Sequence, residues 1–177
     1  MNLDMNDRTA VERRLWDEIE RHQVGMLGIV GADVHHTQPM TAFVEGHDLW
    51  FFTRADTDLA RRVGEGHEAI FVFQAKDLYA CLSGELTLSH DEDRIARYWN
   101  AVAAAWHPQG KDDPLLTMMR LACREAELWI TDGGPMRFAW EIAMANARKH
   151  EPHLGGKANL RFHLPRAFSA EVDTGSA

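Results

Sequence analysis

The stretch "MTAFVEGHDLWFFT", Met40 to Thr53, decides the fold class of this chain. Two short apolar runs, Met40–Glu45 and Asp48–Thr53, flank a tight link that contains Gly46. Apolar runs of this length around a glycine turn are typical of a β-hairpin and are short for a buried helix. The stretch therefore predicts two antiparallel strands.

Further runs of the same type lie on both sides of this hairpin. "GMLGIVG" (Gly25–Gly31) precedes it, and "AIFVFQ" and "YACLSGELTL" follow it as a second pair joined by "AKDL". Gly84 inside the last run predicts a bulge or a sharp bend. "AELWIT" and "NLRFHL" predict one or two later strands. Consecutive short strands with hairpin-length links favour an antiparallel sheet that closes into a small barrel.

Helical patterns surround and interrupt these strands. Val11, Leu15 and Ile19 recur at a four-residue step behind a capping box of Thr9 and Glu12, which predicts an N-terminal helix. A second, short helix is expected after the hairpin in "TDLARRVGEGH", where Thr57 would cap it and Gly64 or Gly66 would end it.

Three more helices are expected in the C-terminal half. Ser89 and Glu92 form a capping box ahead of "DEDRIARYWNAVAAAW". Asp113 with Pro114 at the first helical position predicts a helix over "LLTMMRLAC", and Pro135 predicts another over "PMRFAWEIAMANARKH". The predicted class is α+β, mainly β, with a barrel-like sheet and flanking helices.

Length and composition limit the classes of protein that fit. The 177 residues suit a single domain over 1–170 followed by a frayed tail, 171–177. A net charge of −8 disfavours a nucleic-acid partner. No apolar run approaches the roughly 20 residues of a membrane span, and the N-terminus does not resemble a secretory signal. Cys81 and Cys123 lack C-x-x-C spacing, so a reducing cytoplasm is expected.

Familiar catalytic and metal motifs do not occur in the sequence. G-x-G-x-x-G after a strand, a Walker loop, H-E-x-x-H and G-x-S-x-G are all missing. Ten histidines invite a metal hypothesis, but the pairs His35–His36 and His150–His153 stand at a turn and beside a proline. We predict no metal site and assign no catalytic residue.

The loop "TRADT" after the hairpin is the best candidate for an anion pocket. Thr53 and Thr57 hydroxyls, the Arg54 guanidinium and the free N–H groups of a helix start would converge there. The alternative is that Thr57 only caps the helix, while Arg54 and Arg61 are surface residues. Residue types alone favour that simpler interpretation.

Several segments together resemble the FMN-binding split barrels of the pyridoxamine-phosphate-oxidase-like clan, and within it the bacterial general stress proteins. The similar segments are "QPMTAFVEGHDLWFFTRADTDLARRV", "YACLSGELTLSHDEDRIARYW" and above all "WHPQGKDDPLLTMMRLACREAELW". The last is similar to the subfamily signature W-x-P-x-G-x-D-D-P followed by A-E-x-W. The resemblance runs from Trp16 to Trp129.

The resemblance implies a homodimeric, six-stranded antiparallel split barrel with FMN at the dimer interface. The expected cofactor contacts fall into three groups: a strand beside the isoalloxazine, a phosphate loop, and a loop that covers the flavin. Their residues are, in that order, Gln38, Pro39 and Met40; Phe52, Thr53, Arg54, Thr57 and Arg61; and Trp106, Pro108 and Lys111. A loop in which Trp106 merely fills core is the alternative for the third group.

The resemblance also implies a function. It implies a cytoplasmic flavoprotein that binds FMN and transfers electrons or hydride, and not a true pyridoxamine phosphate oxidase, because the arginine-rich C-terminal segment has no counterpart. Relatives carry arginine where this chain has Gln38, and a lysine near Asp58, so Arg61 or Arg62 would have to reach the phosphate. A flavin-binding stress protein without turnover, or a barrel that binds haem or deazaflavin, stays open.

Overall fold

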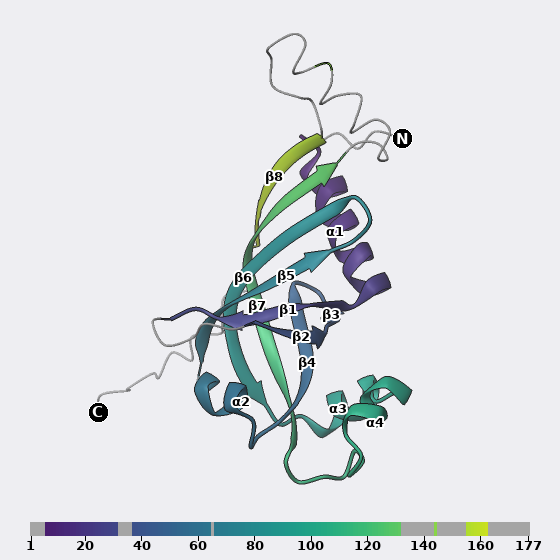
Figure 1. Cartoon of the computed structure of the whole chain (residues 1–177), viewed down its shortest axis with the longest axis vertical. Coiled ribbons are helices and arrows are strands. Elements are labelled where there is room, and N and C mark those ends of the chain that lie inside the picture. Colours follow the sequence, from purple (N-terminus) through teal and green to yellow (C-terminus); the bar gives the residue numbers. More distant parts are fainter. Residues whose placement is uncertain (1–5, 32–36, 65, 132–143, 145–154, 163–177) are drawn as a thin grey trace, which may run out of the picture.

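The computed structural model of the chain describes residues 6–31, 37–64, 66–131, 144 and 155–162. In that part, eight strands form one antiparallel sheet and four helices lie against it or at its ends (Figure 1). The elements follow the order α1 (Arg8–His22), β1 (Val24–Ile29), β2 (Gln38–Thr41), β3 (Phe43–Glu45), β4 (Asp48–Arg54), α2 (Asp58–Val63), β5 (His67–Gln74), β6 (Leu78–Ser89), α3 (Glu92–Tyr98), α4 (Ala101–Trp106), β7 (Leu116–Thr131) and β8 (Gly155–Arg161).

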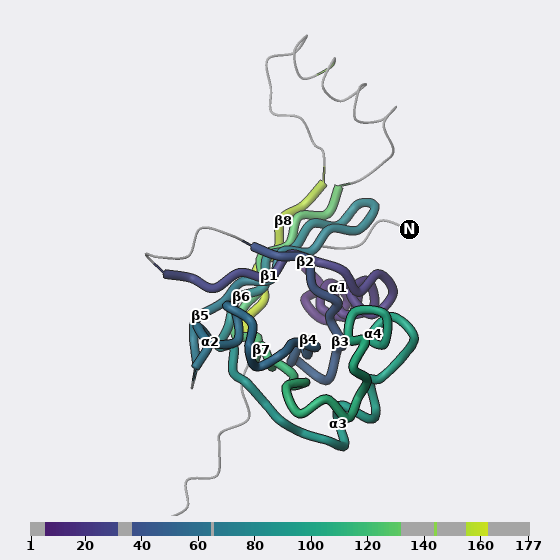
Figure 2. The backbone as a smooth tube through the Cα atoms, turned by 60° about the horizontal axis from the view of Figure 1, so that its bottom comes forward, coloured from purple at the N-terminus to yellow at the C-terminus, as the bar shows by residue number. Residues whose placement is uncertain are grey.

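The sheet closes on itself through one bent segment of chain. Its strand order is β2-β1-β5-β6-β7-β4-β3, with β8 paired to the end of β7. The outermost strands, β2 and β3, are consecutive in sequence and are separated only by Ala42, which is buried and donates its N–H to the Gln23 carbonyl. The predicted strand Met40–Glu45 is therefore divided in two, and the sheet curls into the half-barrel of Figure 2. The predicted α+β split-barrel class is confirmed.

The helix predicted over "LLTMMRLAC" is wrong, because these residues begin the longest strand of the sheet. β7 runs without a break for 16 residues and includes the predicted strand "AELWIT". Asp113 does cap a turn, since its side chain accepts the Leu115 N–H at 3.0 Å, but the chain then extends. Leucine and methionine favour helices only weakly; pairing with β4 on one side and β6 on the other overrides that preference.

The single helix predicted after the Ser89–Glu92 box is also wrong in two respects. Asp91, not Ser89, caps α3, accepting the Arg94 N–H at 2.9 Å. The helix stops after Tyr98, and Asn100 caps a separate α4 by accepting two N–H groups, each at 2.9 Å. Asparagine competes with helical backbone through its side chain, so it breaks the periodic pattern and restarts it.

The first two helices follow the predicted pattern with one shift. Asp7 caps α1 instead of Thr9, so the helix begins two residues ahead of the expected position. Its stripe of Val11, Leu15 and Ile19 is fully buried, as the four-residue step predicted. In α2 the Thr57 hydroxyl accepts the Ala60 N–H at 3.2 Å, and Gly64 follows the last helical residue, both as predicted.

Gly84 produces the predicted bulge in β6. The pairing register between β6 and β7 shifts between Ser83 and Gly84. A Cβ atom built on Gly84 would lie 2.1 Å from the Ala122 carbonyl oxygen, so the two backbones approach more closely than any side chain allows. Only glycine fits at this crossing.

The core fills the curled sheet and continues under α1, where twenty-five buried apolar residues form one cluster. A smaller buried cluster lies under α3 and consists of Phe43, Trp50, Ile95, Leu116 and Met118. No helix in the described residues is long and apolar enough to cross a membrane. The helix predicted from Pro135 and the tail 171–177 fall outside the described residues, apart from residue 144.

Candidate functional site

A cavity of about 500 Å³ opens between the end of β4, the β1–β2 edge and helix α4, and we call it the β4–α4 cavity. This size is within the range of small-molecule sites. Its walls come from six elements or their caps and are formed by Val24, Pro39, Met40, Thr41, Phe43, Phe52, Thr53, Arg54, Thr57, Asn100, Val102, Ala103, Trp106 and His107. The barrel supplies one wall and α4 supplies the other.

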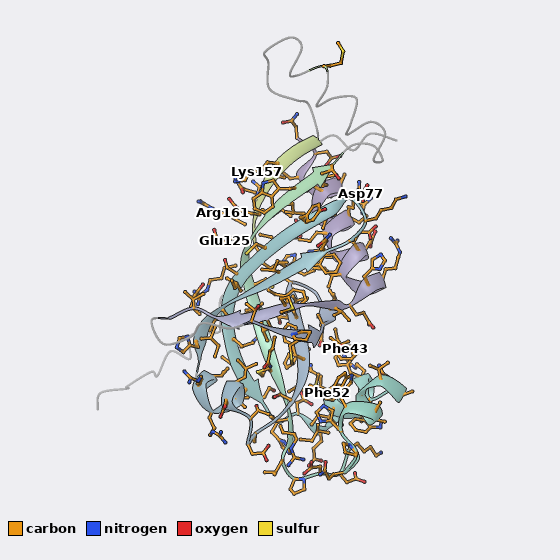
Figure 3. The ribbon with its side chains drawn as sticks, viewed as in Figure 1. Phe43, Phe52, Asp77, Glu125, Lys157 and Arg161 are labelled. Atoms are coloured by element: carbon orange, nitrogen blue, oxygen red, sulfur yellow. The ribbon has the colours of Figure 1, made fainter. Side chains whose placement is uncertain are left out.

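One side of the β4–α4 cavity is aromatic. Phe43 and Phe52 meet edge to face with ring centroids 5.6 Å apart, and Phe52 meets Trp99 in the same way at 5.8 Å. Tyr98 stacks on Phe43 at 4.8 Å and ties this group to α3. Figure 3 shows Phe43 and Phe52 at the end of the molecule that carries α3 and α4. Such a wall suits a flat aromatic ligand.

Two threonines, Thr53 and Thr57, also line the cavity. Thr53 and Thr57 approach to 3.2 Å through their Oγ1 atoms. The Thr57 hydroxyl also donates to the Arg54 carbonyl at 2.9 Å while it caps α2. Thr57 is thus occupied with local structure, as the simpler interpretation held, although it also lines the cavity. Among the described residues, the Thr53 hydroxyl has one hydrogen-bond partner, Thr57, which a ligand could replace.

Arg54 is held by acidic and amide partners. It bonds both Asp56 carboxylate oxygens, at 3.1 and 3.2 Å, and reaches Gln109 at 3.3 Å. It also forms an ion pair with Asp113, whose side chain is only 6% exposed. The Asp56 hydrogen bond raises the pKa of Arg54 and lowers that of Asp56. Arg54 therefore joins the end of β4 to the loop before β7.

The other proposed cofactor residues divide between the cavity and the surface. Pro39 and Met40 line the cavity, and Trp106 stands at its rim with 77% of its surface exposed. Gln38 contacts the Met40 sulfur at 3.4 Å but does not line the cavity. Arg61 turns away and pairs with Asp58 and the Asp56 carbonyl.

The remaining two residues of the covering loop also lie apart from the cavity. Pro108 and Lys111 are not among the residues that line it, although Trp106 and His107 immediately before them are. The turn between them is held by hydrogen bonds of Gly110 to the His107 carbonyl at 2.9 Å and of Asp113 to the Gly110 carbonyl at 3.3 Å. In this single chain, only the start of the loop reaches the ligand space.

Sequence reasoning missed the cavity residues on α4 and its cap. The cavity is lined on this side by Asn100, Val102 and Ala103, because α4 is a separate helix. The sequence analysis expected one continuous helix here and therefore did not place these residues at the site. His107 was also missed, although it stands inside the quoted signature "WHPQG". Its position directly after Trp106 was the available signal.

His107 is a histidine in the cavity wall, and its surroundings lower its pKa. Its ring lies 6.0 Å from Phe52 and 6.4 Å from Trp99, measured between centroids. Burial lowers its pKa below the ordinary value of 6.5, and the nearby Arg54 charge lowers it further, against a smaller opposing effect of Asp113. The imidazole is therefore neutral near pH 7.

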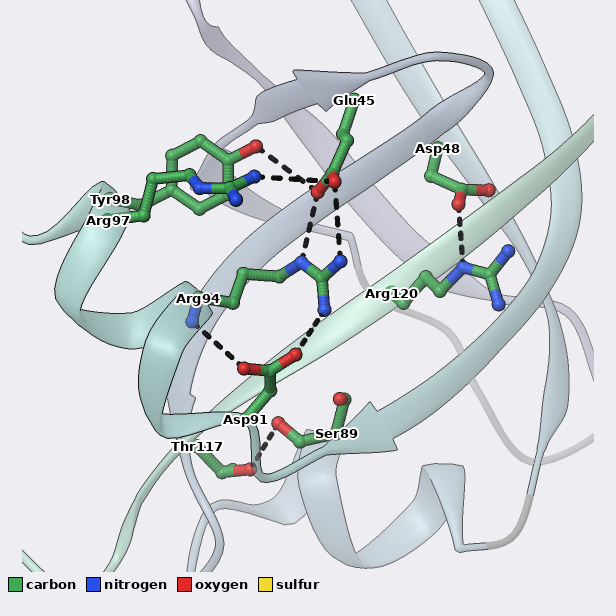
Figure 4. Close-up of polar contacts among 9 residues, drawn as sticks. All are labelled: Glu45, Asp48, Ser89, Asp91, Arg94, Arg97, Tyr98, Thr117 and Arg120. Carbon is green, nitrogen blue, oxygen red and sulfur yellow. Dashed lines mark hydrogen bonds and ion pairs between the residues drawn. The ribbon is translucent and has the colours of Figure 1, made fainter.

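A second, polar cleft of about 430 Å³ lies on the other side of α3. Glu45 receives both Arg94 Nε and Nη2, at 3.0 and 3.3 Å, and Arg94 also pairs with Asp91 at 2.5 Å (Figure 4). Arg94 covers the Trp50 ring at 3.8 Å from its centroid, and Arg120 pairs with Asp48 at 2.8 Å. Charges in this cleft are matched within the chain, which indicates a structural network.

Comparison with known families identifies the same chain region as the sequence signature did. The model of the family described as "Pyridoxamine 5'-phosphate oxidase like" matches residues 10–153. General stress protein 26 of Bacillus subtilis (strain 168) is 22% identical over 124 residues, which cover 67% of this chain and 87% of that protein.

Two solved structures share about a third of their residues with this chain. A general stress protein 26 relative from Jannaschia sp. CCS1 has 34% identity and a TM-score of 0.71, covering 87% of this chain and 99% of that one. A protein from Xanthomonas citri, described as a general stress FMN/FAD binding protein, has 34% identity and a TM-score of 0.66, covering 71% and 92%.

Proposed function

The chain belongs to the pyridoxamine 5'-phosphate oxidase-like family, among its general stress proteins, and we propose that it binds FMN in the β4–α4 cavity and transfers electrons through it. One observation carries the proposal. A single cavity of suitable size joins an aromatic wall to a pair of hydroxyl groups, which are the two surfaces that a flavin ring and its phosphorylated tail require. The Xanthomonas citri relative, described as FMN/FAD binding, supports the choice of ligand.

The aromatic residues of the cavity support the assignment of the flavin ring to their end. Phe43 and Phe52 already pack edge to face, so they present a fixed apolar surface instead of collapsing into the space. Met40 and Pro39 close the opposite edge from β2. These residues would hold the isoalloxazine by apolar contact and exclude water from it, while the redox chemistry is supplied by the bound flavin itself.

The part of the cavity near Thr53 can bind the flavin phosphate only if Arg54 contacts the phosphate in addition to its present partners. Its guanidinium has five N–H donors; Nε and Nη2 each contact Asp56, and Nη1 contacts Gln109 and Asp113, so one Nη2 hydrogen is left for a phosphate. We assign the phosphate to the Thr53 hydroxyl and to Arg54. Arg61 is not needed, since it pairs with Asp58 outside the cavity.

We further propose that two copies of the chain complete the site. Met26 pairs with Pro39 on one side and with Val72 on the other, and Val24 shares its face of β1. Met26, Val72 and Val24 expose 38%, 42% and 56% of their surface, an apolar patch on neighbouring strands. Because Val24 and Pro39 also line the cavity, a second copy seated on this patch would cover the cavity edge.

The first experiment is an absorbance spectrum of the purified protein followed by titration with FMN and FAD. We expect saturable binding with FMN preferred, since Thr53 and Arg54 would bind a terminal phosphate, which FMN carries and FAD does not. A Soret band would instead identify a haem protein. Absence of binding by either flavin would refute the proposal.

The hydroxyl contact is tested by Thr53→Val, which keeps the shape of the side chain. Loss of a hydrogen bond to a charged group costs about 1.5–3 kcal/mol, so FMN should bind roughly 10- to 100-fold more weakly. Thr117→Val is the matched control: Thr117 is the cross-strand partner of Thr53, is equally buried at 6%, and does not line the cavity. Equal FMN affinity in the two variants would mean that the Thr53 hydroxyl does not contact the phosphate.

The rim residue is tested by flavin fluorescence. Trp106→Ala should raise the emission of bound FMN, because an indole at the cavity rim would quench it by contact with the ring. Trp129→Ala is the control, since Trp129 is 39% exposed on β7 and lies outside the cavity. The same FMN emission in the wild type and in Trp106→Ala would mean that Trp106 does not contact the flavin and has a structural role only.

Electron transfer is tested by anaerobic mixing of the FMN complex with NADH or NADPH. Bleaching of the flavin absorbance band and its return with air would support an oxidoreductase. A complex that neither nucleotide reduces would favour a flavin-binding protein without turnover.

The dimer is tested separately: Val72→Glu should convert a dimer to a monomer in sedimentation equilibrium while leaving the circular dichroism spectrum unchanged.

A further inference from the structure

His107 is fixed in the wall of the β4–α4 cavity by contacts on three sides. Its backbone N–H closes α4 by donating to the Ala103 carbonyl at 3.0 Å. Its ring lies against Phe52 on β4 and Trp99 ahead of α4, at centroid distances of 6.0 and 6.4 Å. The imidazole is therefore positioned before any ligand enters, and it belongs to the aromatic side of the cavity.

The two ring nitrogens of His107 have different surroundings. Nδ1 is buried and has no hydrogen-bond partner. Nε2 makes no hydrogen bond to any other described residue, and it is the nitrogen left to reach the cavity that His107 lines. A proton on Nδ1 would bury an unpaired N–H, which is costly. The neutral ring therefore carries its proton on Nε2 and offers a donor to the cavity.

The charges that face His107 support this neutral state. Arg54 on β4 and Asp113 in the loop before β7 are the charged groups near it, and the effect of Arg54 is the larger. Burial and Arg54 both lower its pKa below 6.5. A proton added to the ring would also place an N–H at the buried Nδ1 position. The site is thus built for an imidazole that donates without carrying charge.

We propose that His107 is a ligand-contacting residue, whose Nε2–H donates a hydrogen bond to an uncharged ring oxygen of the flavin. The proposal rests on the proposed flavin binding. A ring carbonyl is chosen over the phosphate because His107 packs with Phe52 and Trp99, whereas the hydroxyls of Thr53 and Thr57 mark the tail end.

The test compares His107→Phe and His107→Gln with the wild type, using riboflavin and FMN as ligands. Phenylalanine keeps an aromatic ring against Phe52 and removes the donor, while glutamine places an amide donor close to the Nε2 position. We expect His107→Phe to bind both ligands about three- to tenfold more weakly, and His107→Gln to recover most of the loss. Riboflavin lacks the phosphate, so an equal loss for both ligands assigns the contact to the ring.

Two results would overturn the proposal while leaving flavin binding intact. One is wild-type affinity for both ligands in a folded His107→Phe variant. The other is a loss confined to FMN, which would move His107 to the phosphate. If His107→Phe does not fold, His107→Leu, which also lacks a donor, takes its place, and wild-type affinity for both ligands in that variant would overturn the proposal equally. A wild-type protein that binds neither flavin would overturn the proposed function and, with it, this contact.

Discussion

Replacement of Gly84 by alanine should destabilise the whole sheet, because the new methyl group has no space. Its Cβ would lie 2.1 Å from the Ala122 oxygen, 2.8 Å from the Ala122 carbonyl carbon and 3.0 Å from the Cys123 Cα. All three are backbone atoms of β7, so no side-chain rotation relieves the contact. An ordinary carbon–oxygen contact needs about 3.3 Å, which requires the strands to separate by about 1 Å.

The cost follows from what holds β7 in place. β4 pairs with one side of this part of β7 and β6 with the other, so a shift disturbs ladder hydrogen bonds on both sides. Overpacking costs about 1–3 kcal/mol, and weakening one or two ladder bonds adds about 0.5–1.5 kcal/mol each. Together they predict a loss of roughly 1.5–6 kcal/mol in the free energy of unfolding, a large part of the 5–15 kcal/mol typical of a domain.

The assay is denaturant unfolding, with the transition midpoint and slope measured for both variants and the wild type. Gly31→Ala is the matched control, because a Cβ there would meet only the His67 Cε1 at an ordinary 3.6 Å. That substitution should change stability by no more than about 1 kcal/mol. A Gly84→Ala loss below about 1 kcal/mol, or equal to that of Gly31→Ala, would refute the reasoning.

Three further predictions concern single side chains. The Arg94 hydrogen bond lowers the pKa of Glu45, so ionised Glu45 stabilises the folded state above the ordinary pKa of 4.5, and this stabilisation is lost as the pH falls through the lowered value. Glu45→Gln should therefore reduce the loss of stability on the acid side, measured as the unfolding midpoint at each pH. Burial raises the pKa of both cysteines, so thiol reagents should react slowly near pH 8, with half-buried Cys81 first and the early phase absent in Cys81→Ser. Thr57→Ala should lose about 1 kcal/mol of stability as the cap of α2, measured by thermal unfolding.

The local patterns that predicted correctly were those whose physical cause lies within a few residues. The four-residue step of Val11, Leu15 and Ile19 needs only helical geometry to form a buried stripe. Thr57 needs only the next turn of chain to act as a cap. Such features survive almost any tertiary arrangement.

The wrong predictions arose where a local preference met a distant partner. Asp113 and Pro114 are a valid helix start, and Asp113 does form a capped turn, but the segment after it pairs with two strands far away in sequence. Hydrogen bonding along 16 residues outweighs the modest helix preference of leucine and methionine. Asn100 is the opposite case: it ends one helix and caps the next by a local interaction, although the apolar pattern runs on across it and predicted a single helix.

The sequence by itself determined the fold class, the hairpin around Gly46, the family and the residue types near a candidate phosphate loop. Only the tertiary structure decided that Ala42 bends the chain from one sheet edge to the other, and that α4 brings His107 to Phe52. It also placed Arg54 between Asp56 and Asp113 and turned Arg61 away. The reason is physical: motifs report short-range geometry, whereas a cavity is formed by elements whose closeness depends on long-range strand pairing.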